Sequence, residues 1–195
     1  MRQLLYVKAV THRVNPIMQT CIGPSEEHVS MAGIPTEASI LDMVERAMPG
    51  RVQNVYAHSS GGGKFIAVIQ FKKTVPSDEG RQRQAALLAF SAFPELKQVI
   101  LVDEDVDIFD TNDVLWAMTT RMQADVDIVT IPGVRCHPLD PSNDPACSWS
   151  IRDHGIACKT IYDATVPFNQ KARFQRAKFM EVDVKKFLPD FTVQD

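Results

Sequence analysis

The sequence has few cysteines, no long apolar run and no concentration of basic residues. Its four cysteines (Cys21, Cys136, Cys147 and Cys158) form no CxxC pair, which argues against a zinc site, and a chain of 195 residues this apolar does not need a disulfide framework. No segment reaches the roughly 18 consecutive apolar residues of a membrane span. The net charge is −3, with Lys and Arg spread among acids, so nothing in the sequence indicates the clustered basic face that nucleic acid would need. We expect a cytoplasmic protein with reduced thiols that binds neither nucleic acid nor membrane.

The first residues have the character of β-strands. The start, Met1 to Lys8, has one basic residue before a short apolar run, and it lacks the length and cleavage site of a signal peptide. We expect extended structure over residues 4–22, broken at Asn15-Pro16 and ended by Gly23-Pro24-Ser25. A strand that begins at once is unusual for a natural amino terminus, because domains usually begin with a few loose residues.

Beyond residue 35 the pattern alternates between helices and strands. Thr36 can cap a helix whose apolar positions recur at three- and four-residue steps until Pro49-Gly50 ends it. We expect strands over 52–58 and 65–72 with a glycine-rich hairpin loop between them, a helix opened by Pro76, a buried strand over 99–102, a helix capped by Asp110, and a strand over 128–131 ended by Pro132-Gly133. This order predicts the α/β class, a layered sheet with flanking helices, followed by a long loop and an irregular tail.

An acidic run, Asp103-Glu104-Asp105-Val106-Asp107, directly follows the predicted buried strand. Open α/β sheets bind ligands at that end of a strand. Carboxylates there could hold Mg²⁺ and a phosphate, which would suggest a nucleotide-sugar transferase. The alternative is a solvated loop that caps the next helix and pairs with Arg or Lys. We favour this alternative because charge clusters at strand ends are common.

The loop Gly61-Gly62-Gly63-Lys64 has only a superficial likeness to a phosphate-binding loop. No GKS or GKT follows and a strand comes next, so a hairpin is favoured. Lys64 at its end could reach into a cleft and pair with an anion or a phenolate. His28, beside two acids, and His137, in a proline-rich loop, are further candidates, although a lone histidine is more often structural. The residue patterns alone leave the reaction open.

Seven strings occur together in a distinctive combination: Val7–Arg13, Gly23–His28, Gly33–Ile40, Asn54–His58, Gly61–Phe65, Leu101–Asp107 and Asn112–Met122. The combination closely resembles the carboxyl-terminal portion of UbiD-type decarboxylases, from about residue 6 to about residue 170. It is most similar to the branch of that family that acts on protocatechuate and gallate.

The resemblance implies non-oxidative decarboxylation of a small aromatic acid with prenylated FMN as covalent electrophile and electron sink. The family's Glu-Arg-Glu/Asp set, and the divalent metal and potassium near the cofactor phosphate, belong upstream of the matched region. We therefore expect no catalytic residue, no metal ligand and no cofactor bound by this chain alone. Residues 1–30 are expected to be a remnant of a flavin-binding β-barrel-like domain, 31–170 the α/β carboxyl-terminal domain, and 171–195 an irregular or helical tail.

The resemblance also implies substrate-facing positions. His28 and Lys64 match residues that face the ring of catechol acids, where they hydrogen-bond or pair with the phenolic oxygens. Ala32, His137 and Leu139 match positions that line the substrate pocket. The family does not use the run around Asp103 as a metal site, so the resemblance favours the paired, helix-capping interpretation there.

Two functions are compatible with these features. The first is the carboxyl-terminal part of a hydroxybenzoic acid decarboxylase, which forms a substrate-pocket wall and an assembly surface in a homo-oligomer or beside a missing amino-terminal half. The second is a non-catalytic oligomerisation module whose catalytic half is on another chain. In both cases we expect the isolated chain to fold and to lack decarboxylase activity.

Overall fold

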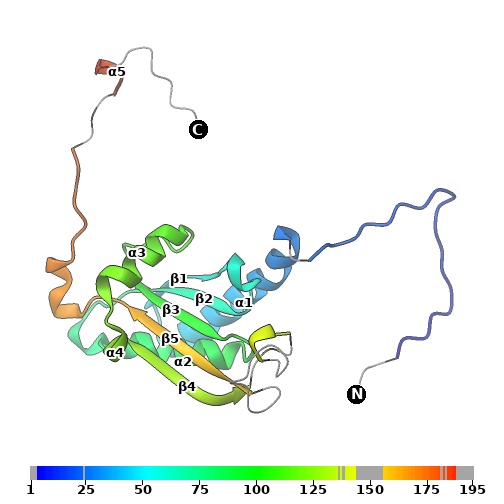
Figure 1. Cartoon of the computed structure of the whole chain (residues 1–195), viewed down its shortest axis with the longest axis horizontal. Helices are drawn as coiled ribbons and strands as arrows, with labels where there is room; N and C mark the ends of the chain where they lie inside the picture. The colour runs from blue at the N-terminus through cyan, green and yellow to red at the C-terminus, as the bar shows by residue number, and fades with distance from the viewer. Residues whose placement is uncertain are drawn as a thin grey trace.

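The computed structural model describes residues 4–23, 25–135, 137, 139–143, 156–180, 182 and 184–187. Its centre is a five-stranded sheet with strand order β1-β2-β3-β5-β4 (Figure 1). The strands are β1 (Val52–Ala57), β2 (Ile66–Phe71), β3 (Gln98–Asp103), β4 (Ile128–Arg135) and β5 (Ile156–Ala164). The inner strands β2, β3 and β5 run parallel, and β1 and β4 are antiparallel edge strands. The hairpin predicted from the glycine-rich loop is confirmed.

Helices cover both faces of the sheet. On one face, α1 (Glu26–Ala47) and α2 (Arg81–Ala92) bury Ile40, Val44 and Ala85 against strand residues such as Ile69 and Leu101. On the other face, α3 (Thr111–Arg121) and the loop before it cover a second apolar cluster, which includes Val68, Val102, Val106 and Val114. Strand β3 is therefore enclosed on both faces, as its continuous run of apolar residues predicts. The remaining short elements are η1 (Ser59–Gly61), η2 (Pro76–Asp78), α4 (Ala124–Asp127), η3 (Pro141–Asn143), η4 (Phe168–Arg173) and α5 (Val184–Phe187).

The first helix begins ten residues before the predicted cap, so the prediction that Thr36 caps it is wrong. Ser25 is the N-cap, and its side chain accepts a hydrogen bond from the backbone N–H of His28, with two acids in the first turn. Thr36 instead donates its hydroxyl to the carbonyl of Ala32, 2.8 Å away. Pro35 lies inside the helix, where proline ordinarily interrupts the backbone ladder. Its presence, together with Gly33, made the sequence look like a turn at this point.

The carboxyl-terminal part of the sheet also differs from the prediction. Strand β4 does not end at Pro132-Gly133 but continues to Arg135, with a register shift between Ile131 and Val134. Because β4 is an edge strand, a proline without an N–H is tolerated there. Strand β5 lies where the sequence indicated a loop and tail. Its buried Lys159 and Asp163 made it look polar, but both side chains have partners within the fold.

Residues 4–23 contain no strand and are exposed along their length (Figure 1). Nothing in this arrangement tests whether they pair with a flavin-binding domain, so that expectation and the domain limits at residues 30 and 170 remain predictions. Within the described segments, no helix combines the length and apolar character needed to cross a bilayer. Cys21 and Cys158 are free thiols, as predicted, while Cys136 and Cys147 lie outside the described residues.

Candidate functional site

The glycine loop lies directly against the first two turns of α1. A β-carbon on Gly63 would come within 2.7 Å of the carbonyl oxygen of Val29 and 2.9 Å of the backbone nitrogen of Gly33. This approach places Lys64, the next residue, beside the helix turn that carries His28 and Ala32. His28 is exposed in the first turn of α1, and Lys64 is half-buried. The tertiary fold therefore brings the segments of three predicted site residues together.

His58, which the sequence did not single out, fixes this loop from the other side. Its Nδ1 accepts hydrogen bonds from the backbone N–H of Ser60 at 3.1 Å and from the Ser60 hydroxyl at 2.8 Å. Its Nε2 lies 2.8 Å from the hydroxyl of Thr111 at the start of α3. Partial burial lowers the pKa of His58, which keeps the ring neutral and able to accept at Nδ1. No local sequence signal predicts the contact, because Thr111 is distant in the chain.

His137 and Leu139 approach the same end of the sheet from the loop after β4. His137 is buried, and its ring meets the Phe65 ring edge-on with centroids 5.3 Å apart. Phe65 directly follows Lys64, so the wall around His137 adjoins the glycine loop. Leu139 is 75% exposed, although it is a large apolar side chain on a loop with several hydrogen bonds. All five predicted substrate-facing residues lie on segments near the amino-terminal end of β3.

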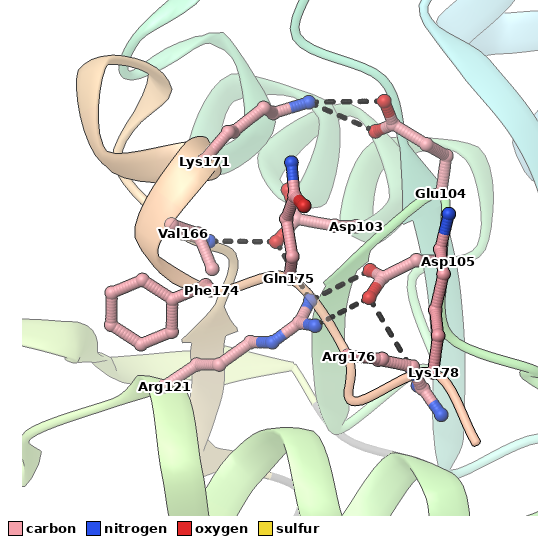
Figure 2. A pocket seen from close by; sticks show the side chains of 10 residues that line it. All are labelled: Asp103, Glu104, Asp105, Arg121, Val166, Lys171, Phe174, Gln175, Arg176 and Lys178. Atoms are coloured by element: carbon pink, nitrogen blue, oxygen red, sulfur yellow. Dashed lines mark hydrogen bonds and ion pairs between the residues drawn. The ribbon is translucent and has the colours of Figure 1, made fainter. Parts of the chain in front are cut away.

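The acidic run lies at the opposite, carboxyl-terminal end of β3 and borders a cavity of about 360 Å³. Figure 2 shows Arg121 and Arg176 both directed at Asp105, and Lys171 at Glu104. Arg176 also pairs with Asp113 at 2.7 Å, and Asp110 caps α3 by accepting from the N–H of Asn112. The prediction that these acids cap a helix and pair with basic side chains is confirmed.

At the base of this cavity, Asp103 and Arg121 form a buried ion pair with an Nη1–Oδ2 distance of 3.0 Å. Burial raises the pKa of Asp103. The N–H of Val166 and the charge of Arg121 lower that pKa, but by less, so it stays above the ordinary value. Burial is the largest influence on the pKa of Arg121 and lowers it, but the hydrogen bond to Asp105 and the charges of Asp105 and Asp103 together outweigh burial and raise that pKa. The pairs fasten residues 166–176, which follow β5, to the carboxyl-terminal end of the sheet.

A metal-bound cofactor phosphate does not fit the part of the chain that the structure describes. Within those residues, no three His, Cys, Asp or Glu side chains are grouped so that they could hold a metal ion. Glu104 and Asp105, which would be the natural oxygen ligands beside the cavity, already pair with Lys171 and two arginines. A divalent ion would have to displace those cations first.

The chain folds as an α/β domain in which a glycine-lysine loop packs on the first helix. Comparison with known proteins identifies the family of this domain. Residues 29–164 match the family described as the 3-octaprenyl-4-hydroxybenzoate carboxy-lyase C-terminal domain, UbiD_C. The chain belongs to this family.

Three relatives place the chain within the family. It is 62% identical over 188 residues to gallate decarboxylase of Lactiplantibacillus plantarum, covering 95% of this chain and 38% of that protein. It superposes on an apo 3,4-dihydroxybenzoic acid decarboxylase from Enterobacter cloacae with a TM-score of 0.82 and 63% identity, covering 90% of this chain and 36% of that one. It also superposes on the UbiD-class enzyme HmfF from Pelotomaculum thermopropionicum in complex with FMN, with a TM-score of 0.77 and 33% identity, covering 90% and 37%. The chain thus spans less than two fifths of the length of each.

Proposed function

We propose that this chain is the carboxyl-terminal part of a cytoplasmic, homo-oligomeric decarboxylase of hydroxybenzoic acids, and that it forms one wall of the substrate pocket. The observation that carries the proposal is the packing of Gly63 on α1, which puts Lys64 beside the turn of His28. An ammonium group and an imidazole at the same edge suit the adjacent hydroxyl groups of a catechol acid. The identity to the gallate and 3,4-dihydroxybenzoic acid decarboxylases supports this substrate class.

In this proposal each side chain has a limited task. Lys64 stabilises a phenolate oxygen by charge, and His28 exchanges a hydrogen bond with the neighbouring hydroxyl. Ala32 and Leu139 bound the ring with small and apolar surfaces, and His137 closes the wall beside Phe65. These contacts orient the ring and select hydroxylated acids, and the reacting carboxylate faces the other part of the enzyme.

We propose that prenylated FMN, with its divalent metal and potassium, binds to the amino-terminal part of the complete enzyme. The FMN-bound UbiD-class relative supports a flavin in the assembled protein. The flavin supplies the electron sink for decarboxylation. In the same proposal this chain contributes the substrate wall, and residues 4–23 connect it to the flavin-binding part of the enzyme.

The test joins this chain to the upstream part of the L. plantarum gallate decarboxylase, replacing the matched 188-residue region. With prenylated FMN supplied, the joined enzyme should decarboxylate gallate or 3,4-dihydroxybenzoate. The 195-residue chain alone, given the same cofactor, should release no CO₂. Turnover by the isolated chain would refute the proposal that the cofactor and the catalytic residues belong to the amino-terminal part of the enzyme.

The same experiment separates the alternative of a non-catalytic assembly module. If the joined enzyme forms oligomers and binds flavin but decarboxylates no aromatic acid, the chain acts only in assembly. A joined enzyme in which Lys64→Met abolishes selection for hydroxylated acids without altering the oligomer supports the pocket-wall function.

A further inference from the structure

From the contacts around His137 we infer that Glu95, in the turn between α2 and β3, is a positioning residue for the substrate wall. Its carboxylate accepts a hydrogen bond from Nε2 of His137, whose Nδ1 accepts from Leu139, and thereby holds the ring between Phe65 and Leu139. The inference rests on the proposed function for its effect on substrate selection. The contacts themselves are independent of that function.

The tautomer follows from the two partners of the imidazole. The backbone N–H of Leu139 donates to Nδ1 of His137 at 3.0 Å, so Nδ1 carries a lone pair and no proton. The ring proton is therefore on Nε2, which lies 3.1 Å from a carboxylate oxygen of Glu95. A carboxylate on one ring nitrogen commonly sets which nitrogen is protonated. With both nitrogens engaged, His137 serves as a wall whose orientation is fixed.

The turn that carries Glu95 is itself held in place. Lys159 of β5 is buried, and its ammonium group donates to the carbonyl oxygens of Pro94, at 2.6 Å, and Leu96. These two carbonyls flank Glu95 in the sequence. A buried ammonium bound to both neighbours leaves the turn little freedom. The carboxylate is therefore presented to His137 from a fixed support.

The same turn also contacts Phe65 and Asp140, which lie next to Lys64 and Leu139 in the sequence. The carbonyl of Phe65 accepts from the backbone N–H groups of Lys97 and Gln98, at 2.9 and 2.8 Å. The Lys97 ammonium pairs with the buried Asp140 at 2.9 Å, one residue beyond Leu139. Glu95 and Lys97 thus contact His137 and Asp140 beyond β4, and Lys97 also holds Phe65 at the end of the glycine loop. The turn that carries Glu95 and Lys97 therefore holds the glycine loop and the residues after β4 in fixed positions relative to each other.

The first arm of the test is structural and uses the 195-residue chain labelled with ¹⁵N-histidine. Long-range ¹H–¹⁵N spectra at neutral pH should show His137 with a bare Nδ1 and a protonated Nε2. Both Glu95→Gln and Glu95→Ala should keep that tautomer, because the Leu139 N–H still donates to Nδ1. Glu95→Ala removes the acceptor of Nε2–H, so this proton should exchange with water faster than in the wild type, whereas Glu95→Gln should keep the exchange slow. An unchanged exchange rate in Glu95→Ala would overturn the inference. A wild-type His137 protonated on Nδ1, or on both nitrogens, would overturn the inference.

The second arm measures selection in the joined enzyme, as the ratio of kcat/KM for 3,4-dihydroxybenzoate to that for 4-hydroxybenzoate. Glu95→Ala should lower the ratio about fivefold to tenfold, the size of one lost hydrogen bond. Glu95→Gln should keep most of the wild-type ratio. Asp42→Asn, which removes an exposed ion pair with Arg46 on α1, should leave the ratio unchanged. Equal losses for both substrates in Glu95→Ala and Glu95→Gln would overturn the inference. If the wild-type joined enzyme is inactive, the proposed function fails, and the tautomer measurement still decides the position of His137.

Discussion

Arg121 reaches back from the last turn of α3 to place its Nη1 3.0 Å from Asp103 Oδ2, at the end of the central strand. Both side chains are almost completely buried, and each leaves one polar atom without a partner in the described structure, Oδ1 of Asp103 and Nε of Arg121. A buried pair of this kind contributes little net stability while intact, but breaking it leaves an uncompensated charge. The pair therefore makes the carboxyl-terminal end of β3 sensitive to substitution.

Replacing the guanidinium should destabilise the chain strongly. Arg121→Met leaves Asp103 buried and unpaired, which should reduce the free energy of unfolding by about 3 kcal/mol or more. Amide exchange at Val166, whose N–H donates to Asp103, should become faster. Urea unfolding measures the first effect. Arg46→Met, which removes an exposed pair with Asp42, should change stability by about 0.5 kcal/mol and serves as the control.

The close approach of the glycine loop to α1 gives a matched pair of variants. Gly62 and Gly63 both have positive φ, at +63° and +68°, so alanine strains the backbone equally at either position. Only Gly63→Ala also drives a β-carbon to 2.7 Å from Val29 O, whereas Gly62 has nothing within 4 Å. We expect Gly62→Ala to cost about 1 kcal/mol and Gly63→Ala about 1–3 kcal/mol more, measured by thermal unfolding. Equal losses would show that the loop moves freely off the helix.

Substrate selection in the joined enzyme should depend on the two polar side chains at this edge. Lys64→Met and His28→Phe each remove one hydrogen bond to a phenolic oxygen of the bound substrate, which should lower kcat/KM for catechol acids by roughly tenfold to a hundredfold. Stability should change little, because neither side chain is buried. Lys72→Met, at the opposite end of β2, is the control for loss of a lysine. Unchanged kinetics in both site variants would remove these residues from the pocket.

The pH dependence of stability should report on His58. Burial lowers its pKa in the folded chain below the ordinary value of about 6.5, so the unfolded chain binds the proton more tightly. The contribution of His58 is complete above that ordinary value and is lost as pH falls through the lowered pKa of the folded state. Unfolding free energies measured from pH 7.5 downward should show the loss, and His58→Gln should remove that part of it. An identical profile in His58→Gln would contradict the assignment.

Divalent metal should not bind tightly at the acidic run. Asp105 and Glu104 are already neutralised by Arg121, Arg176 and Lys171, and Mg²⁺ would have to break those pairs. Calorimetry of the chain with Mg²⁺ or Mn²⁺ should give no heat of tight binding. Micromolar affinity that disappears in Asp105→Asn would instead restore the nucleotide-sugar transferase interpretation.

The predictions from the sequence were wrong for the start of α1 and for strand β5, because both depend on contacts with residues that are distant in the chain. The start of α1 was hidden because Gly33 and Pro35 usually mark a turn, and only the packing of Gly33 against the glycine loop explains why the helix continues. Strand β5 was missed because its lysine and aspartate look solvent-exposed in sequence. Lys159 finds its partners at Pro94 and Leu96, and Asp163 at Arg83, each more than sixty residues away.

By itself the sequence determined the α/β class, the central strand β3, the hairpin around the glycine loop and the capping of α3 by Asp110, because each depends on periodicity or on neighbours within a few residues. Its motifs also carried the family resemblance, which the match over residues 29–164 confirms. Only the tertiary structure decided that the segments of Lys64 and His28 meet, that Arg121 and Arg176 pair with Asp105, and that Glu95 lies 3.1 Å from Nε2 of His137. Those contacts join side chains that no local pattern connects, and they form because burial leaves each polar group only the partner that the fold brings to it.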